Sequence, residues 1–263
     1  MTKWKAQLEI FDSLLKELRR RRQEGDGRLR FDRSAVSVSD IAEQYYCEKK
    51  LEMEYLHGEV ETEAKTMGSE AHEKLIEDAV EIKRAALWRK IYGKEPVLAV
   101  EMFILGKYRD VFLAGQPDAV MFYKGRPIVV FEFKFSKNGM AYPSHHVQAQ
   151  MYGLILENMG FDTSRLFYAI VVADPKTRGD PELQRKAIDA IFNKGFEESI
   201  LSTDDTIIHF CKFHPSEAEE SLRWAVEFWK QNREASPTSN PNKCSKCEYQ
   251  TQCQNTMSSA LTS

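Results

Sequence analysis

The sequence lacks the long apolar stretches of membrane proteins. No run of about 18 apolar residues is present to span a bilayer. The N-terminal residues MTKWKAQLEIFDSLLKELRRRRQEG have no apolar stretch followed by a small-residue cleavage site, which argues against a secretion signal. Internal repeats and low-complexity tracts are also missing. We therefore expect a cytoplasmic protein that does not associate with membranes.

An overall excess of positive charge is absent as well. Lys and Arg number 37 against 40 Asp and Glu, a formal net charge of -3, which excludes a protein that is basic over its whole surface. Residues 1–34 are a local exception, with ten Lys and Arg against six acids. The run from Arg19 to Arg22 is typical of a solvated helix end, and contact with nucleic acid is the alternative.

The periodicity of the chain predicts an α/β protein. A helix follows from Trp4, Leu8, Leu15 and Leu18 near the N-terminus, and another begins around Met67. The further helices are expected at 39–56, 145–158, 183–195 and 216–233. In the first of these, Asp40 and Glu43 mark the start and Cys47 lies in the middle. The expected strands are 97–105, 111–115, 118–123, 127–135, 166–173 and 206–213, with an antiparallel hairpin through Lys124-Gly125-Arg126.

These elements indicate a mixed β-sheet flanked by helices. We expect three parts: a basic helical N-terminal extension at 1–36, a central domain at 37–235, and a C-terminal cysteine-bearing segment at 236–263 that packs against the helix carrying Cys47.

Three charged residues stand in the most apolar stretch of the chain. Glu132 and Lys134 share one face of a strand, and Asp118 starts the partner strand, so the two carboxylates are expected within reach of one metal ion. Carboxylate oxygens suit Mg²⁺ or Mn²⁺, and Lys134 would stabilise negative charge on a phosphate. The pattern therefore indicates phosphodiester hydrolysis, and a simple ion-pair network is the alternative.

The motif order resembles the PD-(D/E)xK nuclease core in its RecB-like branch. The matching stretches are Pro117-Asp118, Glu132-Phe133-Lys134, the upstream GSEAH that ends in His72, and Gln148-x-x-x-Tyr152. The resemblance implies metal ligation by His72, Asp118, Glu132 and the backbone carbonyl of Phe133, catalysis by Asp118, Glu132 and Lys134, and substrate positioning by Gln148 and Tyr152. His145 and His146 are expected to face solvent at the helix start, with approach to the substrate as the alternative.

Cysteines are few and clustered. Cys244, Cys247 and Cys253 lie within ten residues and Cys47 lies far upstream, and four thiolates suit either zinc or an iron-sulfur cluster. Cys211 alternates with apolar neighbours and is expected to be a small core residue. The one-plus-three arrangement resembles that of RecB-like nucleases with a [4Fe-4S] cluster, which favours this cluster over zinc at Cys47, Cys244, Cys247 and Cys253.

The combined motifs resemble the CRISPR-associated RecB-like exonucleases over residues 37–253. This resemblance implies a Mg²⁺- or Mn²⁺-dependent deoxyribonuclease that trims single-stranded DNA ends, with 5′ to 3′ polarity, before an integrase complex inserts the fragments. Glu48 departs from the family pattern, in which a proline commonly follows the first cysteine. The alternatives are a stand-alone RecB-like repair or viral nuclease, and a DNA-binding adaptor that does not cleave.

Overall fold

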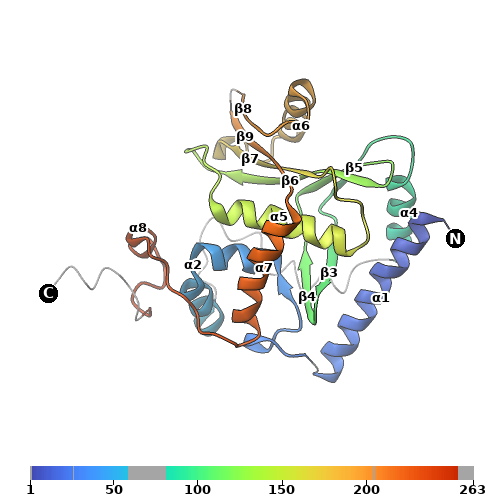
Figure 1. The fold of residues 1–263 in the computed structure, drawn as a ribbon. Coiled ribbons are helices and arrows are strands. Elements are labelled where there is room, and N and C mark those ends of the chain that lie inside the picture. The colour runs from blue at the N-terminus through green and yellow to red at the C-terminus, as the bar shows by residue number, and fades with distance from the viewer. Residues whose placement is uncertain (1, 26, 59–80, 204, 254–263) are drawn as a thin grey trace.

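The computed structural model describes residues 2–25, 27–58, 81–203 and 205–253 (Figure 1). The helices are α1 (Lys3–Glu24), α2 (Val38–His57), α4 (Glu81–Ile91), α5 (Pro143–Asn158), α6 (Glu182–Lys194), α7 (Pro215–Trp229) and α8 (Pro241–Cys244). The strands are β1 (Val36–Ser37), β2 (Val97–Val100), β3 (Ile104–Tyr108), β4 (Val111–Gly115), β5 (Ala119–Tyr123), β6 (Arg126–Phe135), β7 (Phe167–Ala173), β8 (Ser199–Ser202) and β9 (Thr206–Lys212). No helix in these residues has an apolar stretch long enough to cross a membrane.

The larger sheet has six strands in the order β2-β5-β6-β7-β9-β8. β6 and β7 run parallel and the other neighbours are antiparallel, so the sheet is mixed as predicted. The predicted hairpin is confirmed as β5 and β6, joined by Lys124 and Gly125, whose positive φ angles of 51° and 80° match the twist of the flanking strands. β8 was missed by the sequence analysis.

The smaller sheet has the order β1-β4-β3, and its presence corrects the prediction of a single strand over 97–105. The chain leaves the larger sheet at Glu101, whose φ is 48° and whose N–H donates to the carbonyl of Asp118 at 3.0 Å. A positive φ cannot continue an extended ladder. β2 therefore stays in the larger sheet while β3 pairs with β4 in the smaller one.

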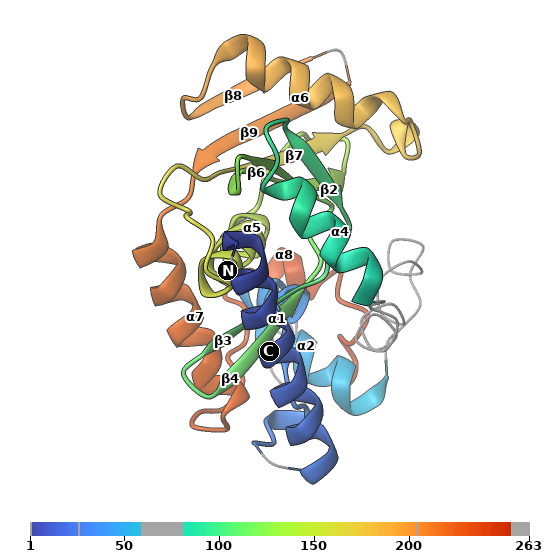
Figure 2. The same ribbon diagram turned by 90° about the vertical axis from the view of Figure 1, so that its right-hand side faces the viewer.

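α5 lies between the two sheets (Figures 1 and 2). Its residues from Val147 to Leu156 are all buried, as expected of a helix covered on every side. The close approach depends on Gly115 of β4, where a Cβ would lie 2.7 Å from the ring of Tyr152. α5 therefore holds its polar side chains inside the protein.

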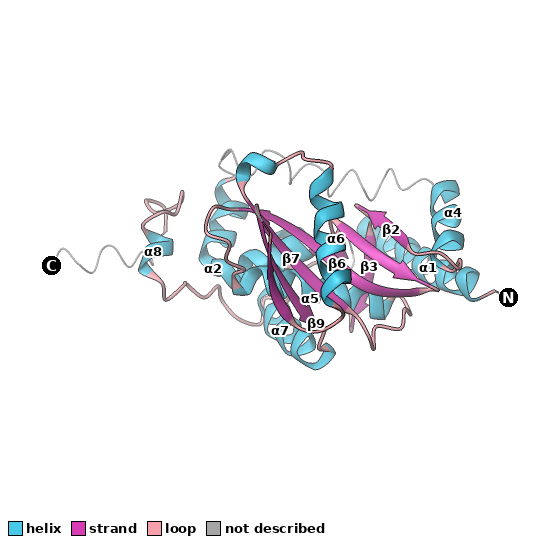
Figure 3. Ribbon diagram, turned by 90° about the horizontal axis from the view of Figure 1, so that it is seen from above, coloured by secondary structure: helices cyan, strands magenta, loops and turns pink. Residues whose placement is uncertain are grey.

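The outer face of the larger sheet is covered by α6 (Figure 3). Ala187 and Ile191 of this helix join a second apolar cluster with Met121, Phe131 and Val171 of the sheet. The six-stranded sheet is thus packed on both faces, by α5 on one and α6 on the other. This arrangement confirms the predicted mixed α/β class, with two sheets in place of one.

α1 packs onto the body of the protein through its apolar side. Phe11, Leu15 and Leu18 are buried, and Lys107 of β3 pairs with Glu17 at 2.8 Å. The predicted end of this helix at the arginine run is confirmed, because Gly25 caps it in the left-handed conformation. The helix expected from Met67 lies outside the described residues as far as position 80, and α4 begins at Glu81.

α2 starts one residue before the predicted position. The start signal is a capping box in which the side chain of Ser37 accepts from the N–H of Asp40, so Asp40 is the third helical residue and not the cap. The helix also breaks at Cys47, where φ is -170° and ψ is 114°. Cys47 is therefore at a kink and not in a continuous helix, and the kink leaves the carbonyl of Tyr46 open to a partner outside the helix.

Candidate active site

Two carboxylates meet where β5 begins and β6 nears its end. Asp118 directly precedes β5, and Ala119 is paired with Phe131, which places Asp118 level with Glu132. The backbone N–H of Phe133 donates to Oδ2 of Asp118 at 2.6 Å. The predicted proximity of Asp118 and Glu132 follows directly from the register of the hairpin.

Glu132 is buried, and only one of its two carboxylate oxygens has a hydrogen-bond partner among the described residues. Its side chain is on the α5 face of the sheet, and the residue is 5% exposed. Oε1 accepts from Nζ of Lys134 at 2.8 Å and from Nε2 of Gln148 at 2.7 Å. Oε2 is buried and has no hydrogen-bond partner among the described residues. Such an oxygen is costly in a folded protein and indicates a missing cationic or donor partner.

The electrostatics of Asp118 and Glu132 also indicate a missing cation. Burial and the nearby Glu132 carboxylate raise the pKa of Asp118 to about 7, against the opposing effects of the Phe133 N–H and Lys134. Two neighbouring carboxylates repel each other when both are ionised, and a bound divalent cation would remove this repulsion. Without one, Asp118 retains a proton up to neutral pH.

Lys134 stays charged in this setting. Burial alone would lower its pKa, but the carboxylates of Glu132 and Asp118 outweigh burial, and the pKa of Lys134 is raised. Its Nζ also donates to Oε1 of Gln148 at 2.9 Å. The ammonium is thus held beside the carboxylates in a fixed position, with about a quarter of the side chain open to solvent.

Gln148 and Tyr152 project together from α5, as their spacing predicted. Nε2 of Gln148 donates to the hydroxyl oxygen of Tyr152 at 3.1 Å, and the Tyr152 hydroxyl donates to the carbonyl of Gln116 at 3.4 Å. Burial and the Glu132 carboxylate raise the pKa of Tyr152 well above its usual value, so it remains a neutral donor. Gln148 links Glu132, Lys134 and Tyr152, and direct contact of Gln148 and Tyr152 with a substrate stays a prediction.

The remaining predicted metal ligand, His72, lies outside the described residues. Within the part of the chain that is described, no group of three or more His, Cys, Asp or Glu side chains is placed to hold a metal ion. Asp118 and Glu132 nevertheless fit a hard divalent cation, because they offer carboxylate oxygens, one of them without a partner, and repel each other in its absence.

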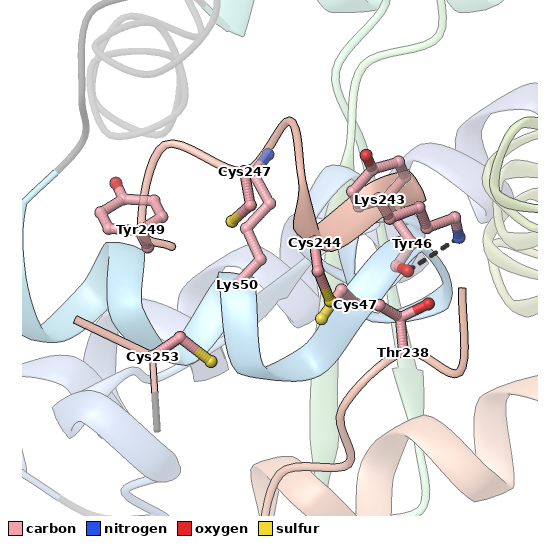
Figure 4. Close-up of a pocket in the computed structure, with 9 residues that line it drawn as sticks. All are labelled: Tyr46, Cys47, Lys50, Thr238, Lys243, Cys244, Cys247, Tyr249 and Cys253. Carbon is pink, nitrogen blue, oxygen red and sulfur yellow. Dashed lines mark hydrogen bonds between the residues drawn. The ribbon is translucent and has the colours of Figure 1, made fainter. Parts of the chain in front are cut away.

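The four predicted cluster cysteines line one pocket (Figure 4). Cys47 comes from the kink of α2, while Cys244, Cys247 and Cys253 come from the described part of the C-terminal segment. Nζ of Lys243 donates to the carbonyl of Tyr46 at 2.9 Å, so the segment supplies the partner that the kink requires. Four thiols around one pocket fit a thiolate-bound group in donor type, although no ready metal geometry is present among the described residues.

The pocket also contains cationic side chains. Lys50 pairs with Glu43 of α2 and with Glu248 of the C-terminal segment, both at 3.4 Å. Burial raises the pKa of the Cys247 thiol, and Lys50 opposes that rise. Cys211 is outside this pocket; it is half-buried against the main core, in line with the expectation of a packing role.

Sequence analysis missed a second buried charge, Glu48, which follows Cys47. Both of its oxygens accept from Arg233 at 2.6 Å, and Oε2 also accepts from the N–H of Ser236 at 2.8 Å. Gln44, one helical turn earlier, donates to Oε1 at 2.8 Å. The residue that departs from the family pattern therefore ties α2 to the linker into the cysteine segment. The turn spacing of Gln44 and Glu48 is the only local signal for it.

The two histidines before Gln148 do not face solvent as expected. His145 and His146 are half-buried, since the chain places β9 beside the start of α5. Nδ1 of His146 lies 3.1 Å from the hydroxyl of Tyr168. Burial and the charge of Lys134 lower the pKa of His145 to about 4, so His145 is a neutral ring.

Comparison with known proteins gives one family. A sequence model described as the PD-(D/E)XK nuclease superfamily matches residues 9–254, which extends the earlier resemblance into α1. No match is found among curated proteins. Among solved structures, the crystal structure of SSO0001 is similar, with 15% identity, a TM-score of 0.45, and coverage of 95% of this chain and 98% of that chain. The family assignment follows from the sequence match.

Proposed function

The chain belongs to the PD-(D/E)XK nuclease superfamily, and on that premise we propose that it is a Mg²⁺- or Mn²⁺-dependent DNA exonuclease acting at Asp118, Glu132 and Lys134. The single observation that carries the proposal is Oε2 of Glu132, which is buried without a hydrogen-bond partner in the described part of the chain and lies beside the Asp118 carboxylate and the Lys134 ammonium. In the structural ion pair of Glu48 with Arg233, by contrast, both carboxylate oxygens accept hydrogen bonds.

The ion would be held by Asp118, Glu132, the backbone carbonyl of Phe133 and His72. When bound, it supplies activation of the attacking water and neutralisation of phosphate charge. The Phe133 N–H fixes Asp118 in place through its 2.6 Å hydrogen bond, which presents the other carboxylate oxygen to the site.

Lys134 and Gln148 do the remaining work on the protein side. The Lys134 ammonium is charged and fixed by Glu132 and Gln148, so it can stabilise the negative charge that builds on the phosphate without reorganising. Gln148 holds Lys134 and Glu132 beside each other through its hydrogen bonds, and its own amide is held by a hydrogen bond to the hydroxyl of Tyr152. Gln148 and Tyr152 would then position the substrate indirectly, by holding Lys134 in place.

The finer assignment is that single-stranded DNA ends are trimmed 5′ to 3′ during CRISPR adaptation, in contact with an integrase complex. It is supported by the motif order and by the four cysteines around one pocket. A stand-alone repair or viral nuclease would share the chemistry but act without an integrase. Added integrase should therefore change the extent or position of trimming if the adaptation assignment holds.

We also propose a [4Fe-4S] cluster at Cys47, Cys244, Cys247 and Cys253. The pocket that these side chains line, and the kink that brings Cys47 to it, support the assignment. Iron and sulfide analysis of anaerobically purified protein should give about four of each per chain. About one zinc per chain with negligible iron and sulfide would overturn it.

Degradation of end-labelled single-stranded DNA tests the catalytic assignment. We expect Mn²⁺-dependent degradation by the wild type and a loss of about a hundredfold or more in Lys134→Ala. Lys94→Ala, which changes an exposed lysine in the turn after α4, is the matched control and should be fully active. Equal activity of wild type and Lys134→Ala would refute the site, and inactivity of the wild type would favour the DNA-binding adaptor.

A further inference from the structure

The loop between β6 and α5, residues 136–142, connects the two halves of the active site. Lys134 lies two residues before it, and Gln148 lies six residues after it. The two side chains are joined by a hydrogen bond of 2.9 Å, so both ends of the loop are anchored at the same point. Tyr142, the last residue of the loop, caps the start of α5 six residues before Gln148, which is about 9 Å along the helix.

The loop is held in a defined position on the sheet. Its first residue, Ser136, donates its N–H to the carbonyl of Ala173 at 2.9 Å. Nε2 of His209 lies 3.0 Å from the carbonyl of Gly139, and this pairing makes Nε2 the protonated nitrogen. Gly139 has φ of 63° and would place a Cβ only 2.3 Å from Ile207, so glycine is required for this close approach.

Two large apolar side chains are nevertheless exposed on this anchored loop. Met140 is 55% exposed and Tyr142 is 42% exposed. The Tyr142 hydroxyl accepts from the side chain of Asn138, and the ring meets His145 edge-on at 5.4 Å between centroids. The ring is thus fixed in orientation while part of it stays open, which is the preorganised state that favours binding of a flat partner.

The ring of Tyr142 contacts His145, which precedes Gln148 by three residues on α5. Burial and the charge of Lys134 lower the pKa of His145. Nδ1 of His145 accepts the backbone N–H of Tyr142 at 3.3 Å. This hydrogen bond uses the backbone of Tyr142, while the ring packs edge-on against His145 and the residue stays 42% exposed.

We propose that Tyr142 and Met140 form a stacking platform for a base of single-stranded DNA next to the phosphate that is cleaved, with Lys137 contacting the backbone of the same strand. The inference rests on the proposed function. An open aromatic face binds any base, and Lys137 is exposed on the same loop. Bases in a duplex are already stacked on each other and cannot reach the ring, so the platform would select single strands.

Equilibrium binding of a fluorescein-labelled 20-nucleotide oligo(dT), in EDTA to prevent cleavage, tests the platform. Tyr142→Leu keeps the apolar bulk and loses the aromatic face, and we expect its Kd to rise about tenfold, since stacking on one base is worth about 1–3 kcal/mol. Tyr142→Trp should stay within about twofold of the wild type. Tyr123→Leu is the matched control, because Tyr123 is similarly exposed at the opposite end of the β5–β6 hairpin.

A second readout separates stacking from a structural role. Single strands carrying 2-aminopurine at successive positions should show quenched fluorescence at one position with the wild type, and this quenching should disappear with Tyr142→Leu. Thermal melts of the two proteins should agree. In Mn²⁺-dependent degradation, KM should rise about tenfold and kcat should change less than threefold.

The outcomes distinguish the two proposals. Unchanged Kd and quenching in Tyr142→Leu, together with an inactive Lys134→Ala, would overturn the platform and leave the nuclease intact. If Tyr142→Leu melts lower, an equally weakened Tyr142→Trp would also overturn the platform, because stacking should survive in that variant. A wild type that neither binds nor cleaves the single strand would overturn both.

Discussion

Glu48 and Glu132 are both buried, but their surroundings differ sharply. Glu48, at the kink of α2, has both oxygens bonded to Arg233 and further donors from Ser236 and Gln44. Glu132, on β6, shares one oxygen with Lys134 and Gln148 and leaves the other without a partner among the described residues, beside a second carboxylate.

The difference separates an anchor from a reaction site. A buried charge with all its hydrogen bonds made fixes neighbouring elements, here α2, the end of α7 and the linker to the cysteines. A buried carboxylate with an open oxygen and a like-charged neighbour is unstable by itself and gains by binding a cation. The same residue type therefore serves as an anchor in one region and, in the proposed function, as a metal ligand in the other.

The largest expected effect is on activity. Glu132→Gln removes the negative charge and keeps the size of the side chain, so we expect Mn²⁺-dependent DNA degradation to fall about a thousandfold, the scale of losing a metal ligand. The melting temperature in EDTA should change little, because the loss of repulsion with Asp118 offsets the loss of the ion pair with Lys134. Initial rates and melts measure the two effects. A variant that retained a tenth of the activity would remove Glu132 from the site.

Glu48→Gln should have the opposite profile. It leaves Arg233 without its charged partner, and we expect the free energy of unfolding to fall by about 3 kcal/mol. Activity of the folded fraction should be close to that of the wild type, which makes each glutamate variant the control for the other. The double variant Glu48→Met with Arg233→Met should recover part of the loss in urea melts. Loss of activity without loss of stability would contradict the anchor role.

Asp118 should make stability depend on pH in the metal-free protein. Its pKa is about 7 in the folded state against 3.8 as an ordinary carboxyl, so the folded state binds a proton more tightly. The stabilisation is fully present below pH 3.8 and is lost as the pH rises through 7, which amounts to about 2 kcal/mol between pH 5 and pH 8.

Urea melts in EDTA across that range measure the effect. Asp118→Asn cannot titrate and should lack this component, so the difference between variant and wild type should change with pH. If the stabilities of the variant and the wild type changed with pH in parallel, the pKa of Asp118 would not be raised in the folded state.

The smallest expected effect is on the melting temperatures of two cysteine variants. Cys247 lines the shared pocket and Cys211 does not, so Cys247→Ser should lower the melting temperature about 3–6 °C more than Cys211→Ser and reduce soluble yield. Iron content should fall in Cys247→Ser alone. The reverse ranking of the two melts would mean that the ligand set is wrong.

Local patterns were enough to predict most of the site. Asp118, Glu132 and Lys134 were expected together because strand alternation and a tight turn fix their relative positions. Gln148 and Tyr152 came from the resemblance to the family motif, and their spacing of one helical turn predicted that they project together. The mixed sheet and its central hairpin followed from the same periodicities.

Features set by distant partners could not be predicted this way. Glu48 meets Arg233 across 185 positions of the chain. The break at Glu101 depends on a hydrogen bond to Asp118, and the burial of His146 depends on β9. Each is decided by tertiary contacts that override local preference.

Calorimetric titration of Mn²⁺ into the DNA-free protein tests the central claim most directly. We expect the wild type and Glu48→Gln to bind Mn²⁺ with similar affinity, and we expect Glu132→Gln to bind it about a hundredfold or more weakly, since a charged ligand is removed from the site. Equal Mn²⁺ binding by Glu132→Gln and the wild type would contradict it.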